Sequence, residues 1–171
     1  DALKEHFESV FINEDVGCMP NVTLKSDRVI THLELNVDEV KKKLINLNVN
    51  KSKGPDNVSP RVLKELNEEI AEIVTKIFQE SIESGEVPQL WKASYVTAIY
   101  KKGSKASPSN YRPISLTCIL CKTLEDIIRK RILEHLVENE LISNEQYGFL
   151  PKRSTSLQLL NIMEEWTKIL D

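Results

Sequence analysis

The segment from Val87 to Leu124 constrains the fold most, because it joins a strand-forming run to a long polar loop. Residues 93–100 are rich in small, aromatic and β-branched side chains, which favour extended structure. A polar loop containing Gly103 follows, and a second short run begins at Tyr111. Two such runs separated by a glycine-containing loop predict a β-hairpin.

The same segment holds six cations and no Asp or Glu, in a chain whose formal net charge is -3. The cations are Lys92, Lys101, Lys102, Lys105, Arg112 and Lys122. Positive charge gathered on one local structure attracts a polyanion such as a nucleic-acid backbone or a nucleotide triphosphate. A solvated lysine-rich turn is the alternative, because charge runs usually lie on solvated faces. Charge alone leaves both interpretations open.

Helical periodicity accounts for most of the remaining chain. Apolar residues recur at helical spacing between cap and turn residues, and we predict helices over residues 2–12, 37–47, 61–66, 68–84, 117–139 and from 154 onward. Residues 13–35 show no sustained period and predict an extended connection. The expected fold class is mainly α with one β-hairpin, an α+β arrangement.

Several residues carry more specific structural predictions. We expect Asn36 and Gly85 to cap helices, Asn57 to tolerate the left-handed region, and Gly148 to adopt a positive φ or admit a neighbouring backbone. The apolar stripe of the helix over 68–84 is expected in the core; it consists of Ile70, Ile73, Val74, Ile77, Phe78 and Ile82. The cations at 129–131 have acidic neighbours at helical spacing, which favours a salt-bridged surface over a nucleic-acid contact.

Cysteine usage and hydropathy indicate in which cellular compartment the protein is expected. Cys118 and Cys121 form a CxxC without a second CxxC or a nearby His to complete a zinc site, so buried, reduced cysteines are expected. No apolar run approaches the length of a membrane span, and the polar N-terminus does not resemble a signal peptide. We therefore expect an intracellular protein, in the nucleus and cytoplasm, with no membrane partner.

Four short blocks in a fixed order resemble the reverse transcriptases of non-LTR (LINE-type, jockey-like) retrotransposons. The blocks are Lys51-Ser52-Lys53-Gly54-Pro55-Asp56, Val87-Pro88-Gln89-Leu90-Trp91-Lys92, Asn110-Tyr111-Arg112-Pro113-Ile114-Ser115-Leu116, and Gln146-Tyr147-Gly148-Phe149 with Arg153-Ser154-Thr155. The resemblance implies the fingers part of a right-hand polymerase fold with an incomplete palm. Residues 1–35 would form an N-terminal extension with a short helix, and residues 36–171 a fingers segment that stops before the catalytic palm strands.

The resemblance also implies binding roles for individual residues. Arg112 and either Lys101 or Lys102 would hold the phosphates of an incoming deoxynucleotide, and the Arg112 guanidinium is suited to bidentate contact. The residues implied to contact the template or nucleic acid are Lys51, Lys53, Gly54, Lys105, Gln146, Gly148, Phe149 and Arg153. The segment around Gly54 is alternatively a basic turn between helices. Asn57 and Leu150 depart from the family, which often has Gly and Arg at these positions.

Polymerisation needs carboxylates that hold two Mg²⁺ ions, together with cations on the triphosphate. The chain contains no Tyr-x-Asp-Asp, so we nominate no catalytic or metal-binding residue, and Asp171 is not one. The full-length enzyme is expected to use Mg²⁺, an RNA template, a DNA primer, deoxynucleoside triphosphates and a palm and thumb segment missing here. The alternative is a non-catalytic remnant, or a module co-opted for binding nucleic acid or protein.

Overall fold

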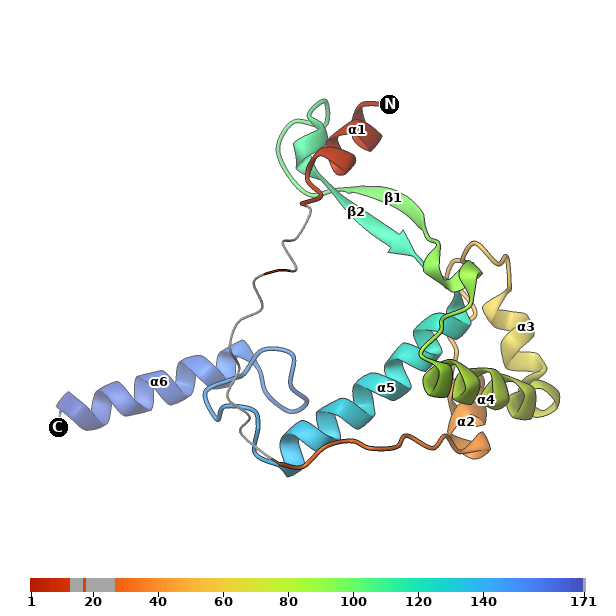
Figure 1. The fold of residues 1–171 in the computed structure, drawn as a ribbon. Coiled ribbons are helices and arrows are strands. Elements are labelled where there is room, and N and C mark those ends of the chain that lie inside the picture. Colours follow the sequence, from red (N-terminus) through yellow and green to blue (C-terminus); the bar gives the residue numbers. More distant parts are fainter. Residues whose placement is uncertain (13–16, 18–26, 171) are drawn as a thin grey trace. The chain divides into compact units, whose positions relative to one another are not determined.

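The computed structural model describes residues 1–12, 17 and 27–170 of the 171-residue chain. The helices are α1 (Ala2–Ser9), α2 (Val37–Ile45), α3 (Pro60–Glu65), α4 (Asn67–Ser84), α5 (Ile119–Glu138) and α6 (Thr155–Leu170) (Figure 1). The strands are β1 (Tyr95–Tyr100) and β2 (Tyr111–Leu116), and short 3-10 helices precede each strand as η1 (Gln89–Lys92) and η2 (Pro108–Asn110). A mainly helical fold with one antiparallel hairpin is therefore confirmed. The extended connection is confirmed for residues 27–35, and most of its earlier part lies outside the described residues.

The described residues fall into two compact units. The first comprises residues 1–12, 17 and 31–129, and the second comprises residues 27–30 and 130–170. The division falls within α5, so that this helix contributes residues to both units. Each unit is described separately below.

The core of the first unit lies among α2, α3, α4 and the beginning of α5. Phe78, Leu44 and Ile127 are its largest fully buried side chains. The ring of Phe78 also makes an edge contact with Trp91 in η1, with centroids 5.7 Å apart. The predicted stripe of α4 is only partly correct, because Ile73 remains 60% exposed and Ile77 40% exposed. The stripe is wider than the surface that neighbouring helices cover, so its outer positions stay in solvent.

Local capping follows the sequence closely. The Asn36 side chain accepts a hydrogen bond from the backbone N–H of Asp38, and Gly85 ends α4 with a φ of 69°. Asn57 adopts a φ of 56°, which confirms the left-handed turn at this position. The prediction for Gly148 is wrong, because the left-handed residue is its neighbour Phe149, at 64°, and a Cβ on Gly148 would meet nothing within 4 Å.

In the second unit, α6 begins as predicted, with the hydroxyl of Ser154 accepting from the backbone N–H of Leu157 at 3.2 Å. No residue of α6 is buried against the rest of the described chain. Its apolar positions, such as Leu160 and Trp166, are 65% and 62% exposed. The helix is therefore formed, but its apolar stripe has no cover among the residues that the structure describes.

The hairpin has a single antiparallel register, with Tyr95 opposite Leu116 and Tyr100 opposite Tyr111. Beyond the strands, the N–H of Lys101 donates to the carbonyl of Asn110 at 2.8 Å, which extends the ladder by one pair. The loop is held by its own side chains. The Asn110 amide donates to the carbonyl of Ser104 at 2.9 Å, and the Tyr111 hydroxyl donates to that of Lys105 at 2.9 Å. The basic loop is thus an ordered structure.

Candidate nucleic-acid interface

The register decides which cations of the hairpin lie on the same face. The hydrogen bond between Lys101 and Asn110 identifies this pair as hydrogen-bonded, and such pairs alternate along an antiparallel ladder. Arg112 is opposite Ile99 at the next hydrogen-bonded pair. Because side chains two residues apart share a face, Arg112 and Lys101 project from the same face as diagonal neighbours. Lys102 lies beyond the ladder.

Pro113 fits the same register. It lies opposite Ala98, at a pair that is not hydrogen-bonded. Its nitrogen therefore faces away from β1, where a missing donor costs no ladder hydrogen bond. Pro113 therefore leaves the pairing of Arg112 with Ile99 undisturbed.

The cations of the hairpin are exposed and largely unpaired. Lys101, Lys102 and Arg112 are all exposed. Within residues 1–12, 17 and 27–170, none of their side chains has a hydrogen-bond or ion-pair partner. The Lys105 ammonium lies 5.7 Å from the centroid of the Tyr100 ring, in a cation–π arrangement. The face that carries Arg112 and Lys101 is therefore free to receive an anion.

The loop containing Gly54 packs directly against the end of the hairpin. A Cβ on Gly54 would lie 2.5 Å from the backbone nitrogen of Cys118 and 2.7 Å from the carbonyl carbon of Thr117. Only glycine allows this approach, so Gly54 is buried for a packing reason. Lys51 and Lys53, on the same loop, remain exposed.

Cys118 joins a third segment to this contact. Its thiol donates to the carbonyl of Leu90 in η1 at 3.3 Å. The segments that contain Gly54 and Leu90 thus both contact the junction between β2 and α5, next to the end of the block that contains Arg112. Backbone packing at Gly54 and the thiol of Cys118 hold these segments together.

Both cysteines of the CxxC are buried and free, as predicted. Burial raises the pKa of the Cys118 thiol. Burial also raises the pKa of Cys121, with a further contribution from its hydrogen bond to the Glu125 carboxylate, to about 11. Both side chains are therefore neutral thiols at physiological pH, which is the state expected of core cysteines.

The remaining candidates lie together in one loop of the second unit. Arg153 donates from Nη1 to the carbonyls of Asn144 and Gln146 at 2.6 and 2.7 Å, and its guanidinium lies 5.4 Å from the Tyr147 ring centroid. The Gln146 amide donates to the carbonyl of Gly148 at 3.4 Å. Arg153 therefore holds the loop in shape. The ring of Phe149 is fully exposed to solvent on this loop.

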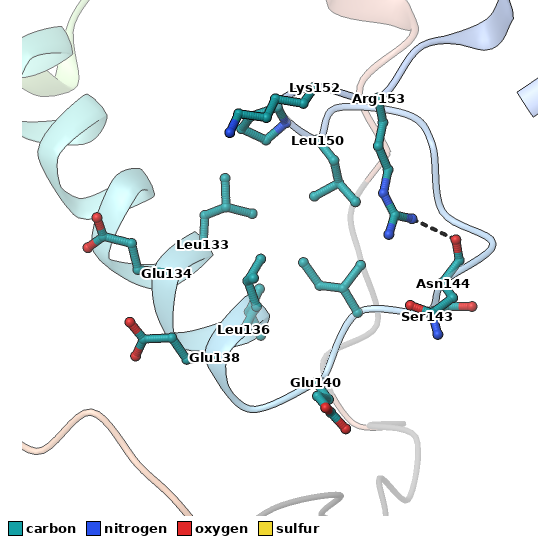
Figure 2. A pocket seen from close by; sticks show the side chains of 13 residues that line it. Leu133, Glu134, Leu136, Glu138, Glu140, Ser143, Asn144, Leu150, Lys152 and Arg153 are labelled. Atoms are coloured by element: carbon teal, nitrogen blue, oxygen red, sulfur yellow. Dashed lines mark hydrogen bonds between the residues drawn. The ribbon is translucent and has the colours of Figure 1, made fainter. Parts of the chain in front are cut away.

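Figure 2 shows a cavity between this loop and the end of α5. Its volume is about 800 Å³, and Leu133, Leu136 and Leu150 point into it. Arg153 forms part of its wall through the bond to Asn144. The cavity is mainly apolar, with charged groups at its rim.

The first unit has a smaller cavity that combines a predicted template contact, Lys51, with lysines from two other segments. Its volume is about 480 Å³, and Lys43, Lys51 and Lys122 are among the residues that line it. The sequence showed Lys122 in the carboxylate-free segment, but nothing local connected it with Lys51. From the sequence, the lysines at 41–43 are predicted to lie on a solvated helix face, with template contact as the alternative.

The described residues do not fit a Mg²⁺ site. In the part of the chain that the structure covers, no three His, Cys, Asp or Glu side chains come together. We therefore assign no metal-dependent step to these residues.

Among the residues that the structure describes, no helix is both long and apolar enough to cross a membrane.

Comparison with known proteins shows which family this chain is similar to. The family described as reverse transcriptase (RNA-dependent DNA polymerase) matches residues 99–171. Two probable RNA-directed DNA polymerases of Drosophila melanogaster, from transposon BS and transposon X-element, are each 29% identical to this chain, over 138 and 146 residues. This chain is similar to the reverse transcriptases of non-LTR retrotransposons. A Pol polyprotein from the type-1 retrotransposable element R1 of Bradysia coprophila is 30% identical over 124 residues.

The similarity to reverse transcriptases extends beyond the family match. The alignments with the BS and X-element polymerases are longer than the matched region and therefore include residues before Ile99. They cover 80% and 85% of this chain but only 15% and 16% of those relatives, and the R1 alignment covers 71% and 12% respectively. The chain thus spans about 15% of the length of the curated relatives it matches.

Proposed function

We propose that this chain forms the fingers region of an RNA-directed DNA polymerase of a non-LTR retrotransposon, and that it binds template and incoming nucleotide. The shared face of Arg112 and Lys101 is the observation that carries the proposal. Two exposed cations without carboxylate partners in the described chain suit a triphosphate, whose charge must be offset while it is positioned. The guanidinium of Arg112 adds bidentate geometry.

The hairpin geometry favours Lys101 over Lys102 as the second phosphate ligand. Lys101 continues the ladder on the Arg112 face, whereas Lys102 lies in the loop beyond it. Lys105 at the loop would contact a strand phosphate instead. In this proposal, the register of the strands alone decides which of the two adjacent lysines contacts the triphosphate.

The other candidates would contact the template. Lys51 and Lys53 would contact its phosphates, while Gly54 positions their loop through its close packing. In the second loop, Phe149 would stack on a base, because every base offers a π-face to an aromatic ring. Arg153 would hold Gln146 in place through its bond to the Gln146 carbonyl, and the Gln146 amide would hold Gly148 through the Gly148 carbonyl.

The proposal assigns catalysis to the whole polymerase. The RNA template, DNA primer, deoxynucleoside triphosphates and Mg²⁺ would meet the aspartates of a palm outside the described residues. When bound there, Mg²⁺ would neutralise phosphate charge and activate the attacking oxygen. The residues of this chain would orient the triphosphate and the template.

Replacement of Arg112 in the full-length polymerase tests the proposal. A charge-assisted contact is worth about 1.5 to 3 kcal/mol. We therefore expect Arg112→Ala to lower kcat/KM for deoxynucleotide incorporation by about tenfold or more, because each 1.36 kcal/mol corresponds to about a factor of ten. Template affinity and melting temperature should stay nearly unchanged. Lys101→Ala should have a similar effect, and Lys102→Ala is the matched control with a smaller one.

Two other outcomes would contradict the assignment of Arg112 and Lys101 to the triphosphate. If Arg112→Ala unfolds the protein, or weakens template binding while nucleotide kinetics stay normal, Arg112 is a structural or template residue. If Lys102→Ala is more harmful than Lys101→Ala, the register argument is wrong.

A further inference from the structure

The smaller cavity of the first unit combines residues from three segments. The end of α2 contributes Lys43 and Asn46, the following connection contributes Asn48 and Lys51, and the first turns of α5 contribute Lys122 and Asp126. The cavity volume is about 480 Å³. Lys51 and Lys122 are thus brought to one concave surface although they lie far apart in the sequence.

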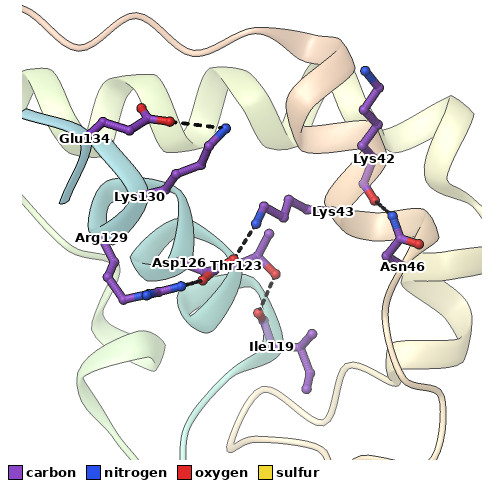
Figure 3. A network of polar contacts seen from close by, with 9 residues as sticks. All are labelled: Lys42, Lys43, Asn46, Ile119, Thr123, Asp126, Arg129, Lys130 and Glu134. Atoms are coloured by element: carbon purple, nitrogen blue, oxygen red, sulfur yellow. Dashed lines mark hydrogen bonds and ion pairs between the residues drawn. The ribbon is translucent and has the colours of Figure 1, made fainter. Parts of the chain in front are cut away.

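The only carboxylate among the described residues of this cavity is already neutralised. Figure 3 shows the Asp126 carboxylate between the Lys43 ammonium, which reaches it from α2, and the Arg129 guanidinium one turn along α5. The contact with Arg129 is 2.9 Å long. Hydrogen bonds from Lys43 and Arg129 hold the pKa of Asp126 below its ordinary value, so that it stays ionised and paired. Asp126 therefore offers little repulsion to an incoming anion.

The other two cations of the cavity are not engaged. In the described part of the chain, the ammonium groups of Lys51 and Lys122 have no hydrogen-bond or ion-pair partner. The cavity as a whole is therefore positively charged. Two lysines without such partners that line one concave surface favour the binding of an anion there.

A neutral donor completes the arrangement. The Asn48 side-chain oxygen accepts from the backbone N–H of Asn50 at 2.9 Å, so its amide NH₂ is left to donate. Apolar groups of Leu47, Pro60 and Ile119 line the same cavity. Ammonium and amide donors beside an apolar surface match a phosphate group attached to a sugar.

We propose that Lys51, Lys122 and Asn48 bind a phosphodiester of a nucleic-acid strand. The inference rests on the proposed function, since it names a strand contact of the same polymerase segment. It assigns Lys122, one of the six cations of the carboxylate-free segment, to a specific phosphate contact shared with Lys51. It also separates Lys51, which lines the cavity, from Lys53, which does not.

The test measures binding of a fluorescein-labelled single-stranded RNA oligonucleotide to the 171-residue chain over a series of salt concentrations. Each phosphate contact with a single strand contributes about 0.7 to the slope of log K against log salt. Lys51→Gln and Lys122→Gln are each expected to lower that slope, and the double variant is expected to lower it by about 0.7 in total, because both lysines contact the same phosphodiester. Lys122→Arg keeps the charge and should keep the slope.

Lys76→Gln is the matched control, because it removes the same charge from an exposed lysine that already pairs with Glu72 on α4 at 2.8 Å. The inference is overturned if the cavity variants behave like this control while their melting temperatures stay unchanged. It is also overturned if the wild-type chain does not bind the RNA. A negative result in this binding test does not affect the assignment of Arg112 to the nucleotide, because that assignment is tested separately through kcat/KM of the full-length polymerase.

Discussion

Gly54 is the residue at which two distant parts of the backbone come closest. Its Cα faces the peptide that links Thr117 to Cys118, and no side chain fits between them. The position therefore requires glycine for space, and its φ lies outside the left-handed region. A basic loop that would otherwise be an ordinary turn is thereby fixed to the end of the hairpin.

Gly54→Ala should destabilise the chain for this reason. Because the nearest atoms are backbone, the added methyl group forces a main-chain shift, and overpacking of this kind costs about 1 to 3 kcal/mol. Gly148→Ala is the matched control, since a Cβ there meets nothing. Urea unfolding of the two variants provides the measurement. Equal stability of both variants would show that the contact can relax without cost.

The two buried thiols lead to a prediction about reactivity. Thiolates are the reactive species, and burial raises the pKa of both Cys118 and Cys121. We expect both to react slowly with iodoacetamide in the native chain at mildly alkaline pH, and rapidly after unfolding. Peptide mapping by mass spectrometry distinguishes them from Cys18. Fast native labelling of Cys121 would contradict its burial against Glu125.

At the scale of elements, side-chain contacts connect α2 and α5 as well as the apolar core. Lys43 reaches Asp126, and the same carboxylate accepts from Arg129. The predicted salt-bridged surface of α5 is confirmed by this contact and by the pairing of Lys130 and Arg131 with Glu134 at 3.8 and 3.6 Å. Arg129, Lys130 and Arg131 therefore form ion pairs with acidic residues of α5 itself.

Removal of the ion pair between Lys43 and Asp126 should lower the stability of the chain slightly, by an amount that depends on pH. The pair is partly exposed, so Asp126→Asn is expected to lower the free energy of unfolding by up to about 1 kcal/mol at neutral pH. Because the folded-state pKa of Asp126 is lowered from 3.8, its contribution is present above that value and is lost as pH falls through the folded-state pKa. Wild type and variant should therefore converge in acid.

Chemical unfolding at several pH values measures this convergence. Glu72→Gln is the control, since it breaks an exposed pair within α4 and should change stability less. A constant difference between wild type and Asp126→Asn at all pH values would mean that the carboxylate is not the source of the stability.

At the scale of the whole molecule, binding residues and catalytic residues are separated. The described residues supply cations at the hairpin, at the loop around Gly54 and in the smaller cavity, but they do not bring together carboxylates for a metal. Positioning of phosphates and activation of the attacking oxygen are distinct requirements of phosphoryl transfer. The described residues accordingly have cations suited to binding phosphates but no cluster of metal ligands.

The 171-residue chain alone should therefore show no polymerase activity. Primer extension on an RNA template, with Mg²⁺ and all four deoxynucleotides, should give no product above background. The full-length polymerase is the positive control under the same conditions. Extension by the purified chain would mean that its acidic residues form a metal site that neither the sequence nor the described fold reveals.

The sequence by itself determined the features that depend on neighbouring residues. Helical periodicity predicted the α-helices α1 to α6, although α1 ends at Ser9, before the predicted end at residue 12, and the short 3-10 helices η1 and η2 were not predicted. Asn36 and Gly85 were recognisable as caps, because a cap acts within one turn of its own helix. The alternation of strand and loop residues likewise predicted the hairpin and the turn at Asn57.

Only the tertiary structure decided which distant residues meet. The register placed Lys101 with Arg112, and a slip of one residue would have reversed every face. The role of Gly54 depends on Thr117 and Cys118, and that of Asp126 on Lys43, 83 residues away. Such contacts form because chain packing brings helices and strands together. Their free energy belongs to pairs of residues, and no local pattern around either residue encodes it.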